Sequence, residues 1–151
     1  MTGAAVPSPT LQGWPWFLMA LCLWREARGC SHAEKLAIAH VIANRATDPK
    51  GRFPKSIAGV ICAPIQFTSI APPLHAVGPA EMANAVSWPK DGDVNFAECC
   101  AIADQFGAAS EGLDPTAGAT NYYSDPIAQV PAWADPAKLT LRLGVFHFYK
   151  L

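Results

Sequence analysis

Apolar residues recur at helical spacing in the first part of the chain. The pattern predicts an α-helix over roughly residues 14–29. A proline near its start and a glycine at its end fit the preferences of helix termini. The residues expected on its apolar face are Phe17, Ala20, Leu21, Trp24 and Ala27.

A second helix is predicted to begin just after Ser31. Ser31 and Glu34 form an S-x-x-E capping box, in which each residue can satisfy a backbone N–H at the helix start. The helical spacing continues as far as Asp48, which precedes Pro49 and is therefore disfavoured in helical geometry. Ser56 is expected to cap a short third helix over residues 57–62.

Strand-like patterns are expected only later in the chain. The stretch 63–93 is rich in proline and glycine, with one short strand predicted over 66–68. A helix is expected from Asn95, with Glu98 completing a second capping box, and an extended segment over 119–123. After a loop, alternation over 139–143 predicts a strand that continues through 146–149. Helices followed by short strands indicate a single α+β domain over 13–151, after a loose arm over 1–12.

Composition narrows the classes of partner. The chain has 151 residues, a formal net charge of −1, and only 15% charged residues. Affinity for nucleic acid or an anionic membrane would require a basic surface, so neither is expected as a partner. The apolar run 14–24 is too short to span a bilayer, so no stable membrane insertion is expected. A neutral polymer such as a sugar chain suits this protein better, and we expect a monomer.

The five cysteines indicate a protein made in a reducing compartment. Their number is odd, and no pair has the C-x-x-C spacing of a zinc site. Residues 1–10 lack lysine and arginine, so they do not form a secretory signal. We therefore expect synthesis in the cytoplasm without a signal peptide.

Glu26 is the first candidate for chemistry. It ends an otherwise apolar helix, where lost hydration of the charged form should raise its pKa and let it donate a proton to a glycosidic oxygen. Arg25 and Arg28 act in the opposite direction if their guanidinium groups point toward the carboxylate. The alternative is an ordinary ion pair between Glu26 and one of these arginines at the surface.

An ordered series of short motifs runs along residues 16–150. Taken together, these motifs resemble the SleB/CwlJ family of cell wall hydrolases, which includes spore cortex-lytic enzymes and phage endolysins. The elements, in chain order, are Glu26-Ala27-Arg28-Gly29, Asn44-Arg45, Phe53-Pro54, Gln66-Phe67, Gly118–Tyr123, Trp133 and His147-Phe148-Tyr149.

The resemblance implies a lysozyme-like, mainly helical α+β domain with a small antiparallel sheet, related to lytic transglycosylases. It implies that Glu26 is the general acid, that peptidoglycan is cut between N-acetylmuramic acid and N-acetylglucosamine, and that no metal or cofactor is needed. One position departs from the family pattern. Many members have a second glutamate where this chain has Cys30, so any supporting role of that acid is absent or moved, for instance to Glu34.

Two reaction routes are compatible with these residues. With one acid, Glu26 protonates the leaving oxygen and then acts as base while the sugar's own 6-hydroxyl attacks, giving a 1,6-anhydro product. This transglycosylase route is the preferred hypothesis. Plain hydrolysis as in a muramidase needs a second carboxyl group across the bond, for which Asp114, Asp125 and Asp135 are candidates.

Seven further residues are predicted to contact the substrate. Aromatic faces stack on sugar rings, and the Gln66 amide can hydrogen-bond to an N-acetyl group, with an ordinary surface amide as its alternative. For Thr120 and Asn121 the prediction is implied by the family resemblance alone. Ordinary core packing is the alternative for the aromatic residues. The candidates are Gln66, Thr120, Asn121, Tyr122, Tyr123, Trp133 and His147.

Two other classes of function are compatible with the sequence. A cysteine peptidase or amidase of the wall would pair Cys30 with His147. A non-catalytic module would bind glycan through its aromatic residues without cutting it. The short chain favours a phage-type endolysin, which would reach the wall or periplasm after release through a separate pore.

Overall fold

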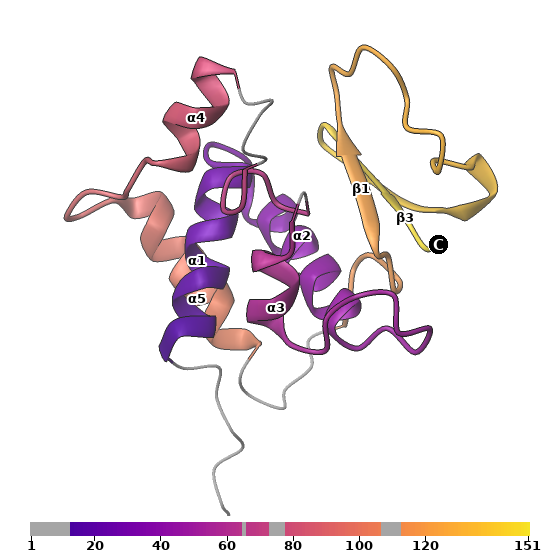
Figure 1. The fold of residues 1–151 in the computed structure, drawn as a ribbon, viewed down its shortest axis with the longest axis horizontal. Helices are drawn as coiled ribbons and strands as arrows, with labels where there is room; N and C mark the ends of the chain where they lie inside the picture. Colours follow the sequence, from indigo (N-terminus) through magenta and orange to yellow (C-terminus); the bar gives the residue numbers. More distant parts are fainter. Residues whose placement is uncertain (1–12, 65, 73–77, 107–112) are drawn as a thin grey trace, which may run out of the picture.

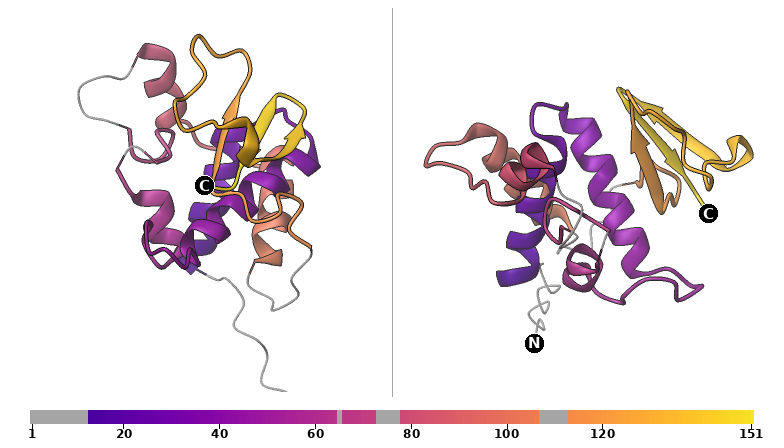
Figure 2. Two further views of the ribbon diagram at one scale, coloured as in Figure 1. Left: turned by 90° about the vertical axis from the view of Figure 1, so that its right-hand side faces the viewer. Right: turned by 45° about the horizontal axis from the view of Figure 1, so that its top comes forward.

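The computed structural model describes residues 13–64, 66–72, 78–106 and 113–151. The predicted N-terminal arm, 1–12, lies outside these residues. The described parts contain five α-helices, one short 3-10 helix and a three-stranded sheet, which confirms the α+β class. The sheet lies to one side of the helices (Figures 1 and 2).

Helix α1, Gly13–Ala27, forms the centre of the helical layer. It packs against α2 (His32–Ala46), α3 (Ile57–Cys62) and α5 (Val94–Gln105), as Figure 1 shows for α1 and α5. From Leu18 to Trp24 every side chain is buried, because this helix has neighbours on all sides. Its apolar sequence is therefore that of a core helix.

The helix starts show which local sequence signals the fold uses. The capping box of α2 is present as predicted: Ser31 Oγ accepts from the Glu34 N–H at 3.2 Å, and the Ser31 N–H donates to Glu34 Oε2 at 2.6 Å. Ser56 caps α3 through the Gly59 N–H. The predicted start of α5 at Asn95 is wrong, because Asp93 caps this helix by accepting from the Phe96 N–H at 2.9 Å.

Two other predictions fail in the proline-rich stretch. Residues 66–68 form turns and no strand, and α4 (Pro79–Ala85) is a helix that the sequence did not indicate. None of the α4 side chains is buried, so an apolar stripe that would reveal it is missing.

The sheet has the order β1-β3-β2 and is antiparallel throughout. Its strands are β1 (Asn121–Ser124), β2 (Leu139–Leu143) and β3 (Phe146–Tyr149), and the 3-10 helix η1 (Pro136–Lys138) precedes β2. The predicted continuation of one strand through 149 is wrong, because the chain reverses at Gly144, whose φ is +55°. The Glu34 carboxylate lies against this turn, because the Val145 N–H also donates to it.

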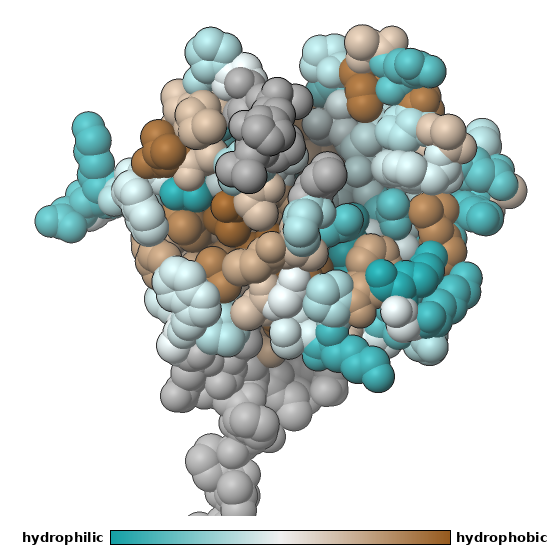
Figure 3. Space-filling view, viewed as in Figure 1, coloured by the Kyte–Doolittle hydropathy of each residue, from teal (hydrophilic) through white to brown (hydrophobic). Residues whose placement is uncertain are grey.

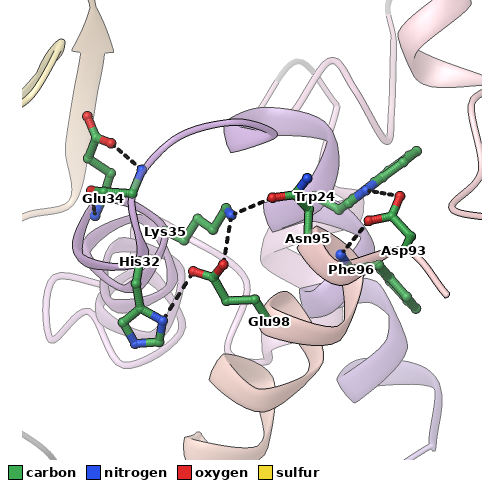
Figure 4. A network of polar contacts seen from close by, with 9 residues as sticks. Trp24, His32, Glu34, Lys35, Asp93, Asn95, Phe96 and Glu98 are labelled. Atoms are coloured by element: carbon green, nitrogen blue, oxygen red, sulfur yellow. Dashed lines mark hydrogen bonds and ion pairs between the residues drawn. The ribbon is translucent and has the colours of Figure 1, made fainter.

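The last turn of α2 holds the segment that leads into β1. Arg45 is buried, and its Nε donates to the Thr120 carbonyl at 2.6 Å. Asn44 donates to the Ala119 carbonyl at 2.9 Å and to Asp114 Oδ2 at 2.9 Å. Elsewhere in this layer, buried Lys35 of α2 reaches Glu98 of α5 at 3.3 Å (Figure 4).

Asp114 is anchored from several directions. Burial alone would raise its pKa, but hydrogen bonds from the Thr116 and Asn44 side chains and from the Thr116 and Gly118 N–H groups outweigh it and lower the pKa. The contacts to Thr116 Oγ1 and Gly118 N measure 2.7 and 2.8 Å. Its carboxylate thus organises the loop before β1.

We expect Asp114→Ala to reduce the free energy of unfolding by about 1.5–3 kcal/mol at neutral pH, because it removes hydrogen bonds to a charged acceptor. A lowered folded-state pKa contributes stability above the unfolded-state pKa, of about 3.9 for an aspartate, and that stability is lost as the pH falls through the folded-state pKa. The difference between wild type and variant should therefore shrink in acid. Urea denaturation across pH measures it, with Glu81→Ala on exposed α4 as control; an equal loss at all pH values would contradict the assignment.

Candidate active site

Glu26 lies at the C-terminal end of α1 and is half-buried. Two hydroxyl groups donate to its carboxylate: Ser69 Oγ lies 2.5 Å from Oε1, and Tyr122 Oη lies 3.3 Å from Oε2. The three residues come from a helix, a loop and strand β1, so the carboxylate sits between the helical layer and the sheet. The face shown in Figure 3 is hollowed between these two parts.

Tyr122 belongs to the sheet face that is turned toward the helices. Its ring packs against Phe146 and Phe148 of β3, with ring centroids 5.8 and 5.7 Å away. Burial, and secondarily the nearby Glu26, raises the pKa of the Tyr122 phenol well above its ordinary value. The hydroxyl therefore keeps its proton at neutral pH and serves as a donor to Glu26.

Arg25 fixes the loop that carries Ser69. Its Nη1 donates to the Ser69 carbonyl at 2.8 Å, and its Nε and Nη2 donate to the Ser87 carbonyl at 3.1 and 2.7 Å. Burial lowers the pKa of Arg25, but an arginine remains charged in this range. One guanidinium group thus joins two loops beside the candidate acid.

Arg28 points to a different set of partners. Its Nη2 donates to Asn84 Oδ1 at 3.0 Å and to Ser87 Oγ at 3.1 Å, and its Cζ lies 3.6 Å from the centroid of the Trp24 ring. Neither Arg25 nor Arg28 forms an ion pair with Glu26 within the described parts of the chain. The surface ion pair considered as an alternative for Glu26 does not form.

Arg45 connects two of the predicted substrate-binding residues. Besides Thr120, it donates from Nη1 to Gln66 Oε1 at 3.2 Å, and its guanidinium lies over Phe67 with Cζ 5.3 Å from the ring centroid. Burial lowers its pKa. Thr120 Oγ1 in turn donates to Asn121 Oδ1 at 3.1 Å. Gln66, Thr120 and Asn121 therefore form one connected group.

The remaining predicted aromatics lie together on the opposite face of the sheet. Tyr123 stacks on His147 at 4.6 Å between ring centroids, and Trp133 lies 6.3 Å from Tyr123 and 5.5 Å from Tyr149. Side chains of successive strand residues point to opposite faces, so Tyr123 is directed away from the Glu26 side that Tyr122 faces. The structure thus joins Tyr122 with Glu26 but places Tyr123, Trp133 and His147 in a second cluster.

His147 is already engaged through both ring nitrogens. Arg142 Nε donates to Nδ1 at 3.2 Å, so Nε2 carries the proton and donates to Asp125 Oδ2 at 2.6 Å. Cys30 forms no hydrogen bond to His147, although both residues are described. Burial raises the pKa of the Cys30 thiol, whereas a nucleophilic cysteine needs a lowered pKa. This geometry gives a cysteine mechanism no support.

Sequence reasoning did not identify Ser69 or the roles of Arg25 and Arg45. Ser69 follows the Gln66-Phe67 element closely, so a hydroxyl just beyond that element was the available signal. For Arg25 and Arg45, the available signal was that each is a charged residue within an otherwise apolar helical segment, which indicates a buried arginine with hydrogen-bond partners. Among the described residues, no group of three or more histidine, cysteine, aspartate or glutamate side chains is arranged to hold a metal ion. None of the helices there has the length and apolar character to cross a membrane.

Comparison with known proteins assigns the chain to a protein family. Residues 29–149 match the model of the cell wall hydrolase family, and the chain belongs to that family. The chain is 34% identical over 131 residues to a spore cortex-lytic enzyme of Halalkalibacterium halodurans, and 33% identical over 120 residues to one of Bacillus subtilis. These alignments cover 87% and 79% of this chain but only about a third of each relative, 33% and 32%.

Solved structures agree with this assignment. The fold is similar to the catalytic domain of the Bacillus cereus SleB protein, with a TM-score of 0.62 and 25% identity over 98% of this chain and 99% of that one. It is also similar in fold to the catalytic domain of the germination-specific lytic transglycosylase SleB from Bacillus anthracis, with a TM-score of 0.63 and 24% identity over 92% of this chain and 97% of that one. The family resemblance predicted from the sequence is confirmed.

The two arginines that flank Glu26 offer a matched test of the loop anchor. We expect Arg25→Met to lower the free energy of unfolding by about 1–3 kcal/mol, because it leaves the Ser69 and Ser87 carbonyls without a donor. Arg28→Met, at an exposed position, should cost less than about 1 kcal/mol. Thermal and urea unfolding compare them, and equal losses would count against the anchoring role of Arg25.

Proposed function

We propose that this protein cleaves the glycan strands of peptidoglycan, with Glu26 as general acid and then base. The observation that carries the proposal is the half-buried carboxylate held by Ser69 and Tyr122 and not paired with either neighbouring arginine. Membership of the cell wall hydrolase family supports the substrate class. Similarity to a domain named a lytic transglycosylase supports the same reaction type.

The two hydroxyl donors define how Glu26 acts. Each binds a different carboxyl oxygen, so together they fix the plane of the group. Donors to a carboxylate stabilise the charged form, which Glu26 adopts once it has given its proton to the leaving oxygen. Glu26 then takes the proton of the attacking hydroxyl, and the cycle closes with the carboxyl protonated again.

The engagement of the three candidate aspartates, all of them among the described residues, favours the anhydro route over hydrolysis. The three candidate aspartates all have other roles: Asp114 organises the loop before β1, Asp125 accepts from His147, and Asp135 caps η1 through the Ala137 N–H. A single acid suffices if the muramic acid 6-hydroxyl is the nucleophile. We therefore propose that the product carries a 1,6-anhydro ring and that no water is consumed.

We propose that two groups of residues contact the substrate. Arg45 occupies the amide oxygen of Gln66, so the Gln66 amide N–H groups are the donors left for an N-acetyl group. Thr120, which is buried, and Asn121, which is half-buried, are linked to Gln66 through Arg45 and stay predicted contacts. The second group stays a set of predicted sugar contacts: Tyr123, Trp133 and His147. Because these residues lie on the sheet face turned away from Glu26, a glycan strand that contacts them must pass around the edge of the sheet.

The biological setting remains a prediction. The relatives reported above are spore cortex-lytic enzymes, whereas the sequence alone favoured a phage-type endolysin released from the cytoplasm through a pore. The bond cleavage proposed for this chain is compatible with either setting. A glycan-binding module without activity would show the same fold and is separated from an enzyme by the next experiment.

We expect Glu26→Gln to lower the rate of wall clearing by at least about 10²–10⁴-fold, the usual contribution of a general acid–base. Glu81→Gln, an isosteric change on exposed α4, should leave the rate unchanged. Turbidity loss of purified peptidoglycan measures both variants. Clearing by Glu26→Gln at the wild-type rate would remove Glu26 from the mechanism.

The products of the wild-type digestion identify the route. Mass spectrometry should show muropeptides ending in a 1,6-anhydro sugar, which are lighter by one water than hydrolysis products. Products with a normal reducing end would instead show hydrolysis. That result would leave the glycosidase assignment standing and replace the transglycosylase step.

Tyr122→Phe tests whether the phenol orients the acid. Loss of one hydrogen bond to a charged group corresponds to about 1.5–3 kcal/mol, so kcat should fall by roughly 10–100-fold while KM changes little. Tyr149→Phe is the matched control, since it removes a hydroxyl from β3 on the face turned away from Glu26. Equal effects of the two variants on kcat would contradict the role of Tyr122.

A further inference from the structure

A second concave site lies beside α1, separate from Glu26. It is a groove of about 470 Å³, within the range of about 300–1,000 Å³ that is common for small-molecule sites. Its lining includes Trp24, Arg28, Trp88, Lys90 and Asp93.

The groove lies on a different side of α1 from the candidate acid. Trp24 and Arg28 stand two positions before and after Glu26, and two positions on an α-helix correspond to a rotation of about 200°. Glu26 reaches Ser69 and Tyr122, whereas Trp24 reaches Asp93 and Arg28 reaches Ser87. The two sites therefore share a helix but face different surroundings.

Trp88 supplies an open aromatic wall. Phe17 stacks on its ring at 6.0 Å between centroids, and Arg25 lies against it with Cζ 5.2 Å from the centroid. Even so, 60% of the Trp88 surface remains exposed. A large indole fixed by its neighbours yet open to solvent is typical of ligand-binding surfaces, and an aromatic face of this kind stacks on the apolar face of a sugar ring.

Fixed polar groups form the other walls. Both carboxylate oxygens of Asp93 are occupied, Oδ1 by the Phe96 N–H at 2.9 Å and Oδ2 by Trp24 Nε1 at 3.1 Å (Figure 4). Arg28 lies over the buried Trp24 ring and is held by Asn84 and Ser87. In the described ranges no carboxylate lies within 4.0 Å of Arg28 or Lys90, so both cations remain available to an acidic ligand.

We propose that this groove is an accessory saccharide site that binds an acidic sugar unit of peptidoglycan away from the cleavage site. The sugar ring would lie on Trp88, and its carboxylate, from the lactyl group or the attached peptide, would meet Arg28 and Lys90. The choice of ligand rests on the proposed function. Its size and mixed polarity suit a sugar unit better than a protein partner, which needs about 800 Å² of surface on each side.

Binding by the full chain in the Glu26→Gln background tests the site without cleavage. The probes are purified insoluble peptidoglycan and a soluble disaccharide-peptide derived from it. We expect Trp88→Ala to weaken binding of both by about 5–10-fold, the loss of one aromatic stacking contact. Trp14→Ala is the matched control: Trp14 is 63% exposed and stacks on Phe17 but does not line the groove, so binding should stay within about twofold of the parent.

A charge reversal at Lys90 tests whether the site binds the acidic part of the ligand. It also gives a second test of the proposal if Trp88→Ala fails to fold. Lys90→Glu should weaken binding of the disaccharide-peptide but leave binding of an uncharged N-acetylglucosamine oligomer unchanged. Lys55→Glu, at another exposed lysine, should alter neither. Unchanged binding in both Trp88→Ala and Lys90→Glu would overturn the proposal, as would a Trp88→Ala variant that changes only the oligomeric state.

Activity measurements separate this proposal from the proposed function. On otherwise wild-type protein, Trp88→Ala should slow clearing of insoluble wall and preserve turnover of short soluble glycan strands. If Glu26→Gln abolishes clearing while Trp88→Ala clears insoluble wall at the wild-type rate, the accessory site is wrong and the enzyme assignment stands. If the wild type binds the wall without producing any cleavage, the enzyme assignment fails while the binding site is retained.

Discussion

The contact between the buried Arg25 guanidinium and two loop carbonyls determines how the candidate site is built. The carbonyl oxygen of Ser69 is buried and that of Ser87 is partly buried, and a buried acceptor without a donor is costly. Arg25 satisfies both and brings the Ser69 hydroxyl to Glu26. Arg25 donates to these neutral carbonyls and forms no ion pair with the neighbouring Glu26 carboxylate.

Arg45 likewise holds a backbone carbonyl, on the sheet side of the site. It donates to the carbonyl of Thr120, directly before β1, and so helps to position Tyr122 next to Glu26. Both arginines are buried, and neither forms a salt bridge within the portion of the chain that the structure describes. The site is therefore organised by cations that hold the backbone, while the Glu26 carboxylate is held by two hydroxyl groups.

The elements that the sequence predicted well are those with a local signal. The apolar spacing of α1 and the capping box at Ser31 both act within a few residues, and both are present. Helix α4 was missed because it buries none of its side chains. The hairpin was read as one strand because Gly144 is the only local sign of the reversal. At the site, Glu26 was predicted from its motif, whereas the Ser69 and Tyr122 contacts join residues 43 and 96 positions away, which no local pattern reports.

Glu34 has a role that reaches beyond the helix it caps. Its carboxylate accepts from Ser31 at the start of α2 and from Val145 in the hairpin turn, and backbone hydrogen bonds of this kind lower its pKa. A Cβ atom at position 144 would collide with this carboxylate, so the turn tolerates only glycine while Glu34 stays in place. One carboxylate thus links the N-terminus of α2 to the turn between β2 and β3. Among related proteins, a change at one of these positions should be accompanied by a compensating change at the other.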